Sequence, residues 1–143
     1  MKELIIAVDF DGTVCIGNNY PDIGNPRMWL INRLKGLRKD GHKLILWTCR
    51  SNSSIPDMGF NNAHDLDDAV DWCRQFGLEF DAVNENLNES KYPGVKLSRK
   101  IYADVYIDDR ACLFIDEEEN LALLGTEKTT GFSTIVKLLS IGI

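Results

Sequence analysis

The stretch LIIAVDFDGT, residues 4–13, joins five consecutive apolar residues to two acids, Asp9 and Asp11, which are separated by one residue. An apolar run without alternation predicts a β-strand that is buried on both faces, as the strands of parallel sheets are. Gly12 follows the second acid and permits a sharp exit from the strand. The stretch therefore predicts an interior strand of a parallel sheet, with reactive side chains at its carboxyl end.

Further strands and helices alternate along the rest of the chain. Short apolar runs predict strands at residues 43–47, 80–83 and 103–107, with 112–115 as a further candidate. Apolar residues at helical spacing predict a helix from Asn25-Pro26 to Gly41 with Leu30, Leu34 and Leu37 inside, a second from Leu66 to Gly77, and a third over residues 132–139. Polar connections predict loops at residues 14–25, 51–62, 84–99 and 117–130.

This alternation predicts an α/β protein. We expect a three-layer α/β/α, Rossmann-like fold with a central, mainly parallel sheet. The length of 143 residues fits a single domain, residues 1–143.

Charge, hydropathy and cysteine spacing exclude several classes of protein. The net charge is −6, and a folded acidic domain is not typical of nucleic-acid binders, although a local basic pocket can lie on an acidic protein. No apolar run approaches the ~20 residues that cross a bilayer, and no secretory signal precedes the first strand. The four cysteines are scattered and form no C-x-x-C pair, which disfavours a zinc site. We expect a cytoplasmic protein without a membrane partner.

Three of the predicted strands end in polar residues. These are Asp9 and Asp11 after the first strand, Thr48 and Arg50 after the second, and Asp108 and Asp109 after residues 103–107. The carboxyl ends of parallel strands share one edge of a sheet, where ligands bind. Carboxylates that crowd together repel one another unless a cation binds, and oxygen ligands suit Mg²⁺ best. The sequence therefore predicts a magnesium site at this edge.

Three sequence blocks occur in the order seen in the haloacid dehalogenase (HAD) superfamily of phosphohydrolases. They are DFDGT at 9–13, LILWTCR at 44–50 and KIYADVYIDD at 100–109. The chain resembles this superfamily over most of its length. The intervals between the blocks leave no room for a large cap domain, so the resemblance implies a capless member with an open site.

The resemblance also implies roles for the matched residues. Asp9 is expected to attack phosphorus, and Asp11 to act as acid and base. Asp9, the backbone carbonyl of Asp11, and Asp108 are expected to bind Mg²⁺, with Asp109 acting directly or through water. Thr48 is expected to hold a phosphoryl oxygen.

Further residues are assigned to the substrate. The turn that contains Gly12 and Thr13 is expected to face the phosphate with its amides. Arg50 is expected to bind the substrate, with a solvated surface position as the alternative. Tyr20 and Phe60 lie in loops near the predicted site, where they are candidates for stacking on a base.

A lysine is expected to neutralise the phosphoryl group, but its identity stays open. Lys100 is the first choice, because its block resembles that of the 5′(3′)-deoxyribonucleotidases. A strand over residues 103–107 would place Lys100 at the opposite edge of the sheet unless the chain folds back. Lys96 and Lys91 are the other candidates.

These features predict a magnesium-dependent phosphatase that forms an aspartyl-phosphate. The expected substrate is a phosphorylated small molecule such as a nucleotide or sugar phosphate. A nucleic-acid 3′-phosphate is also open, although the net charge does not favour it. The alternatives are a phosphate-accepting signalling module, which normally places its adjacent acid pair on the first strand, and a binding protein without turnover. The sequence does not predict an oligomeric state.

Overall fold

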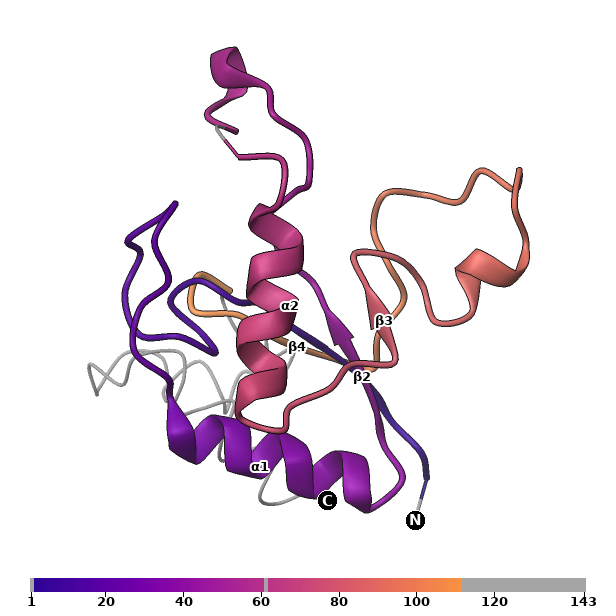
Figure 1. Ribbon diagram of the computed structural model, residues 1–143. Coiled ribbons are helices and arrows are strands. Elements are labelled where there is room, and N and C mark those ends of the chain that lie inside the picture. Colours follow the sequence, from indigo (N-terminus) through magenta and orange to yellow (C-terminus); the bar gives the residue numbers. More distant parts are fainter. Residues whose placement is uncertain (1, 61, 112–143) are drawn as a thin grey trace, which may run out of the picture.

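A parallel β-sheet forms the centre of the protein in the computed structural model, which describes residues 2–60 and 62–111. Its strands are β1 (Ile5–Val8), β2 (Lys43–Leu46), β3 (Ala82–Val83) and β4 (Val105–Ile107). Every pairing is parallel, and the order across the sheet is β3-β2-β1-β4 (Figure 1). The predicted Rossmann-like α/β fold is thus confirmed.

Both outer strands are shorter than predicted, because an aspartate side chain replaces backbone pairing at the amino end of each. The Asp81 carboxylate accepts a hydrogen bond from the backbone N–H of Leu44, with N and Oδ2 2.9 Å apart. The Asp104 carboxylate likewise accepts one from the N–H of Ile5, at 2.8 Å. The strands predicted to begin at residues 80 and 103 therefore begin at residues 82 and 105.

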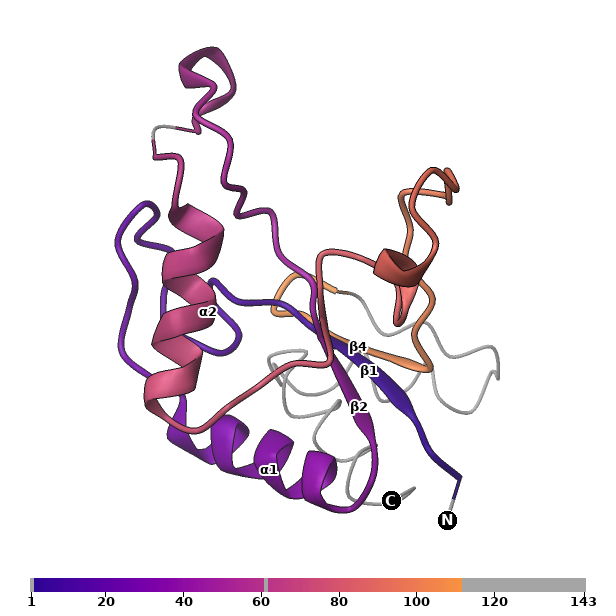
Figure 2. The ribbon, with the colours of Figure 1, turned by 45° about the vertical axis from the view of Figure 1, so that its right-hand side comes forward.

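Two helices, α1 (Met28–Lys39) and α2 (Asp65–Gln75), lie against one face of the sheet (Figures 1 and 2). The predicted apolar stripe of α1 is fully buried there, in a core shared with residues of β1, β2 and β4. Ile101 packs on the opposite face, against Ala7 and Ile45. The strand predicted at 112–115 and the helix predicted at 132–139 lie outside the described residues.

Helix α1 begins later than its predicted Asn25-Pro26 start. Pro26 pairs with Cys15 in an isolated antiparallel bridge, and Arg27 occupies the position before the first helical residue. The Arg27 side chain donates hydrogen bonds to the carbonyls of Gly12 and Thr13, at 3.0 and 2.8 Å. Residues 26 and 27 are thus used for the bridge and the hydrogen bonds to the loop after β1, and the helix begins after them.

The register of the sheet brings the carboxyl ends of three strands to the same level. Val8 is aligned with Leu46 of β2 and with Ile107 of β4. The residues that follow these strands therefore leave the sheet side by side, which is the position expected for a ligand site in an open parallel sheet.

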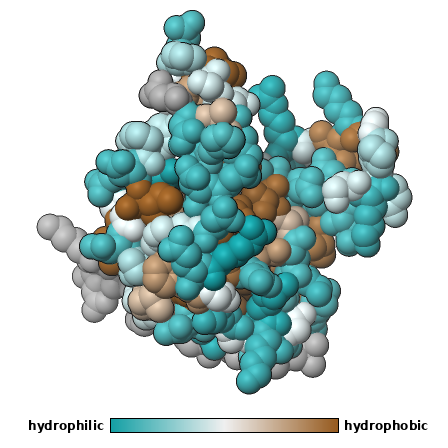
Figure 3. Space-filling model, in the orientation of Figure 1, coloured by the Kyte–Doolittle hydropathy of each residue, from teal (hydrophilic) through white to brown (hydrophobic). Residues whose placement is uncertain are grey.

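Two irregular segments project beside this edge. We call residues 51–60 the flap and residues 84–103 the arm. Each contains a single three-residue 3₁₀ helix, Pro56–Met58 in the flap and Glu89–Lys91 in the arm. Figure 3 shows the two projections as separate lobes in which apolar and polar side chains mix. The described chain thus carries no large cap domain, as predicted.

The described helices, α1 and α2, both lack the length and apolar character that crossing a membrane requires.

Candidate active site

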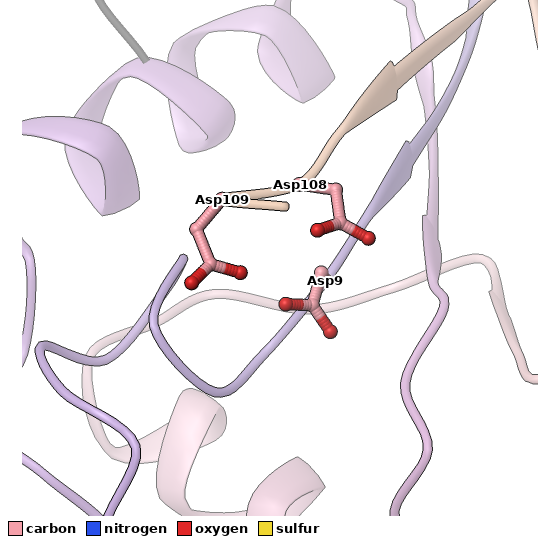
Figure 4. Close-up of side chains that lie close together, drawn as sticks. All are labelled: Asp9, Asp108 and Asp109. Carbon is pink, nitrogen blue, oxygen red and sulfur yellow. The ribbon is translucent and has the colours of Figure 1, made fainter. Parts of the chain in front are cut away.

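Three carboxylates meet where β1 and β4 end. Asp9 directly follows β1, and Asp108 and Asp109 directly follow β4. One oxygen of each lies within 4.8 Å of one oxygen of the other two, and Figure 4 shows the three groups facing a common space. The backbone N–H of Asp9 also donates to the carbonyl of Ile107 at 2.9 Å, which extends the strand pairing to the site itself. Such an oxygen-only cluster has the donor chemistry for a hard divalent cation.

The electrostatics of Asp9 reflect this crowding. Burial, followed by the negative charge of Asp108, raises the pKa of Asp9 from 3.8 to about 7. A hydrogen bond from the backbone of Phe10 and one from Thr13 act in the opposite direction. A bound cation would favour the charged carboxylate and offset the repulsion.

Thr13 and Gly12 arrange these acids. The buried hydroxyl of Thr13 donates to the Asp9 carboxylate and accepts from the backbone N–H of Asp109, both at 3.1 Å. Gly12 has a φ of +78°, and a Cβ at this position would lie 2.4 Å from Oδ2 of Asp109. Both residues thus position carboxylates, and neither lines the pocket described below. The expectation that the amides of their turn face a phosphate stays a prediction.

Asp11 is not part of this acidic cluster, and it pairs with Arg50 instead. The two side chains form a two-point ion pair, with Nε and Nη2 of Arg50 donating to the carboxylate oxygens at 2.9 and 2.8 Å. Arg50 also donates to the carbonyls of Pro21 and Asp22, at 3.1 and 3.0 Å. It is 2% exposed, so the alternative of a solvated surface arginine is wrong. Four of the five guanidinium N–H groups are occupied by the protein, which makes Arg50 a clamp for Asp11.

Aromatic rings and a buried acid surround this clamp. The guanidinium carbon of Arg50 lies 5.1 Å from the ring centroid of Phe10 and 5.2 Å from that of Tyr20. The Tyr20 hydroxyl donates to Asp65, which is 1% exposed, at 2.6 Å. Sequence reasoning did not assign Asp65 to the site, because it is one of three acids in the first turn of α2 and nothing local distinguishes it.

Thr48 stands at the end of β2, where Asn84 holds its backbone. The N–H of Thr48 donates to Oδ1 of Asn84 at 2.8 Å, and Nδ2 of Asn84 donates to the carbonyl of Arg50 at 3.1 Å. The Thr48 hydroxyl accepts from the N–H of Arg50 at 3.2 Å. Its own proton is thus available for a phosphoryl oxygen. Asn84 was also not predicted as a site residue, since it lies after β3, in the segment interpreted only as a loop.

These groups line one pocket of about 470 Å³. Its polar wall contains Asp9, Asp11, Thr48, Arg50, Asp108, Asp109 and Arg110, together with Asn18 and Cys49. Its apolar wall comes from Tyr20 and from Met58, Gly59 and Phe60 of the flap. The pocket thus combines acidic groups with an apolar side.

No lysine of the described chain lines this pocket. The ammonium of Lys100 lies 5.7 Å from the ring centroid of Tyr106, and Lys100 lines a separate groove. Lys91 and Lys96 are exposed on the arm. Lys100 therefore does not line the pocket, and the described cations that do are Arg50 and the exposed Arg110.

No model of a known family matches the chain, and no curated protein matches it. A solved structure, described as that of a conserved protein coded by a locus from Bacteroides thetaiotaomicron, matches with a TM-score of 0.62. The two sequences are 36% identical over 87% of this chain and 94% of the other. The chain belongs to the same family as this Bacteroides protein. The description of this relative names no activity.

Proposed function

We propose that this protein is a magnesium-dependent phosphomonoesterase of the HAD type, with Asp9 as its nucleophile. The observation that carries the proposal is the meeting of Asp9, Asp108 and Asp109 at one point, in a pocket that Thr48 also lines. The three acids supply the ligands for a hard cation, and Thr48 supplies a donor for the phosphate. The match of sequence blocks 9–13, 44–50 and 100–109 to the superfamily adds to this argument.

The first chemical step uses Asp9. One of its carboxylate oxygens attacks phosphorus, the bond from phosphorus to the ester oxygen breaks, and an aspartyl-phosphate forms. Thr48 donates its hydroxyl proton in a hydrogen bond to a phosphoryl oxygen, and Arg110 supplies positive charge at the rim of the pocket. When bound by Asp9, Asp108 and Asp109, Mg²⁺ would neutralise charge on the phosphoryl group and the acids.

The second step restores the enzyme. A water attacks the phosphorus of the intermediate, the bond from phosphorus to the Asp9 oxygen breaks, and inorganic phosphate leaves. We assign the proton transfers to Asp11, which lines the same pocket. It would donate a proton to the leaving oxygen in the first step and accept one from water in the second. Both transfers use an oxygen that Arg50 must first release, because the two Asp11 oxygens accept hydrogen bonds from Nε and Nη2 of Arg50. Arg50 then acts as a positioning residue, because it holds the Asp11 carboxylate at two points.

The experiment that tests this function is phosphate release with and without Mg²⁺. The purified full chain is incubated with p-nitrophenyl phosphate and with a panel of phosphorylated metabolites. We expect release that needs Mg²⁺ and disappears in Asp9→Asn, which removes the nucleophilic charge while keeping the size of the side chain. Asp40→Asn, an exposed acid after α1, is the matched control and should behave like the native protein. Full activity in Asp9→Asn would exclude the proposed nucleophile.

A further inference from the structure

The arm concentrates positive charge on an acidic protein. Residues 90–103 contain four basic side chains, Lys91, Lys96, Arg99 and Lys100, and no acid, in a chain whose net charge is −6. All four are exposed, and none forms an ion pair with another residue of the described chain. The overall charge therefore hides a local basic surface suited to a polyanion.

Apolar and aromatic side chains lie between these cations. The exposed fractions are 66% for Tyr92, 55% for Val95, 47% for Leu97 and 64% for Tyr102. A groove of about 500 Å³ lies under the arm, and Leu97, Lys100, Tyr102 and Tyr106 contribute to its lining. Proteins that bind single-stranded nucleic acids combine these same elements, with cations along the backbone and aromatic rings against the bases.

Hydrogen bonds hold the arm in shape. The backbone N–H of Tyr102 donates to Oδ1 of Asn86 at 2.8 Å, which joins the two legs of the arm at its base. Asn86 also donates two hydrogen bonds to the carboxylate of Glu89, at 2.7 and 2.9 Å. Glu85 and Glu89, the two acids of the arm, both precede Ser90, so residues 90–103 carry only positive charge. Asp104, directly after the arm, accepts a hydrogen bond from the Tyr102 hydroxyl at 3.1 Å.

The arm is also joined to the candidate active site. Asn84, its first residue, bridges the backbone of Thr48 and the carbonyl of Arg50. Both residues line the pocket that contains the acids. A strand whose terminal phosphate occupies the pocket would reach the arm by crossing the carboxyl end of β2 toward β3, the neighbouring strand in the sheet.

We propose that the arm binds the backbone of a single-stranded polynucleotide, and that the substrate of this enzyme is the terminal phosphate of such a strand. The proposal rests on the proposed function. It favours a polynucleotide over a mononucleotide or a sugar phosphate as the substrate. Either of these small molecules, held in the 470 Å³ pocket, would leave the four cations of the arm without a ligand. The negative net charge does not oppose it, since the cations are gathered on one projection.

The test compares a charge-depleted arm with a matched control. Lys91→Gln, Lys96→Gln and Arg99→Gln are combined in one variant, while Lys100 is kept because it packs on Tyr106. The control combines Lys2→Gln, Lys39→Gln and Arg74→Gln, which removes three exposed cations near the opposite, amino edge of the sheet.

Phosphate release is measured on five substrates. They are single strands of about 12 nucleotides, a length within the range that such modules cover, with a 3′- or a 5′-phosphate, the corresponding mononucleotides, and p-nitrophenyl phosphate. We expect the native protein to prefer one of the strands over its mononucleotide. The arm variant should raise KM for that strand by about tenfold or more and leave p-nitrophenyl phosphate turnover unchanged, whereas the control variant should change neither. Equal kcat/KM for strand and mononucleotide would overturn the proposal.

Binding to Asp9→Asn separates failure of the arm proposal from failure of the proposed function. Anisotropy of a labelled, unphosphorylated strand is followed as salt concentration rises. Each cation that contacts a phosphate adds about 0.7 to the salt dependence for single strands, so loss of three should lower the slope by about 2. If Asp9→Asn binds the strand through the arm but the native protein releases no phosphate, only the proposed function would be rejected. The arm proposal would be rejected if the arm variant showed the same salt dependence of strand binding as the protein with an intact arm. It would also be rejected if the three substitutions changed only self-association.

Discussion

Asp11 and Arg50, 39 positions apart in the sequence, form a two-point ion pair in which the arginine side chain is only 2% exposed. A guanidinium matches both oxygens of a carboxylate, and an amine cannot reproduce this geometry. The pair fixes the position of the Asp11 carboxylate at the pocket. Arg50 itself is held by two further hydrogen bonds, which it donates to backbone carbonyls of the loop before α1.

Arg50→Gln should destabilise the protein and slow turnover. Removal of one member of a buried ion pair typically costs about 3–5 kcal/mol, and we expect a value near the lower limit because Asp11 is partly exposed. Arg50→Lys should recover little of the loss, since charge alone does not hold two oxygens. Urea unfolding measures the first effect and kcat the second.

Arg74→Gln is the control for this prediction. Arg74 and Asp71 form a pair with side chains that are 61% and 67% exposed, so its loss should cost less than about 1 kcal/mol. If Arg50→Gln unfolded at the same urea concentration as Arg74→Gln, the ion pair with Asp11 would not contribute to stability.

Thr13→Val should lower activity although Thr13 does not touch the pocket. Valine keeps the shape but loses the hydroxyl that joins the Asp9 carboxylate to the backbone of Asp109. Loss of a buried hydrogen-bonding group costs about 1–3 kcal/mol, and both acids would lose their fixed positions. We expect weaker Mg²⁺ activation and a lower kcat. Thr13→Ser retains the hydroxyl and should preserve most of the activity, so equal losses in the two variants would contradict this role.

The stability of the metal-free protein should fall as the pH rises from about 4 to about 7. The pKa of Asp9 is about 7 in the folded protein, against 3.8 for an unperturbed group. Between these values the folded state binds a proton that the unfolded state has released, so the contribution of Asp9 to stability is present below pH 4 and is lost as the pH passes 7. Thermal unfolding in EDTA across this range measures the effect. The difference in Tm between Asp9→Asn and the native protein should grow with pH, and a constant difference would be inconsistent with the raised pKa.

Mg²⁺ should stabilise the native protein and not the variants of its proposed ligands. A ligand present at 100 times its Kd adds about 2.7 kcal/mol, which corresponds to a rise in Tm on the order of 10 °C for a chain of this size. Asp108→Asn should lose most of this rise, and Asp40→Asn should retain it. The rise should also be smaller at pH 6 than at pH 8, because protons compete with the metal for Asp9. A full magnesium response in Asp108→Asn would remove this residue from the proposed site.

Local patterns in the sequence were sufficient to predict much of this protein. The apolar runs before Asp9, Thr48 and Asp108 predicted three parallel strands and the edge at which their terminal residues meet. The stripe of Leu30, Leu34 and Leu37 predicted the buried face of α1. These inferences succeed because strand alternation, helical periodicity and the direction of parallel strands depend on residues that are close in sequence.

Other features required the folded chain. Arg50 was expected to bind the substrate or to face solvent, but it is a buried partner of Asp11. Lys100 was assigned to the phosphate, but it lies against Tyr106 in a separate groove. Asn84 and Asp65 carry no local signal. Partners that are dozens of positions apart meet only when the path of the loops between them is known, and that path is set by packing over the whole core. Short-range periodicity contains no information about it.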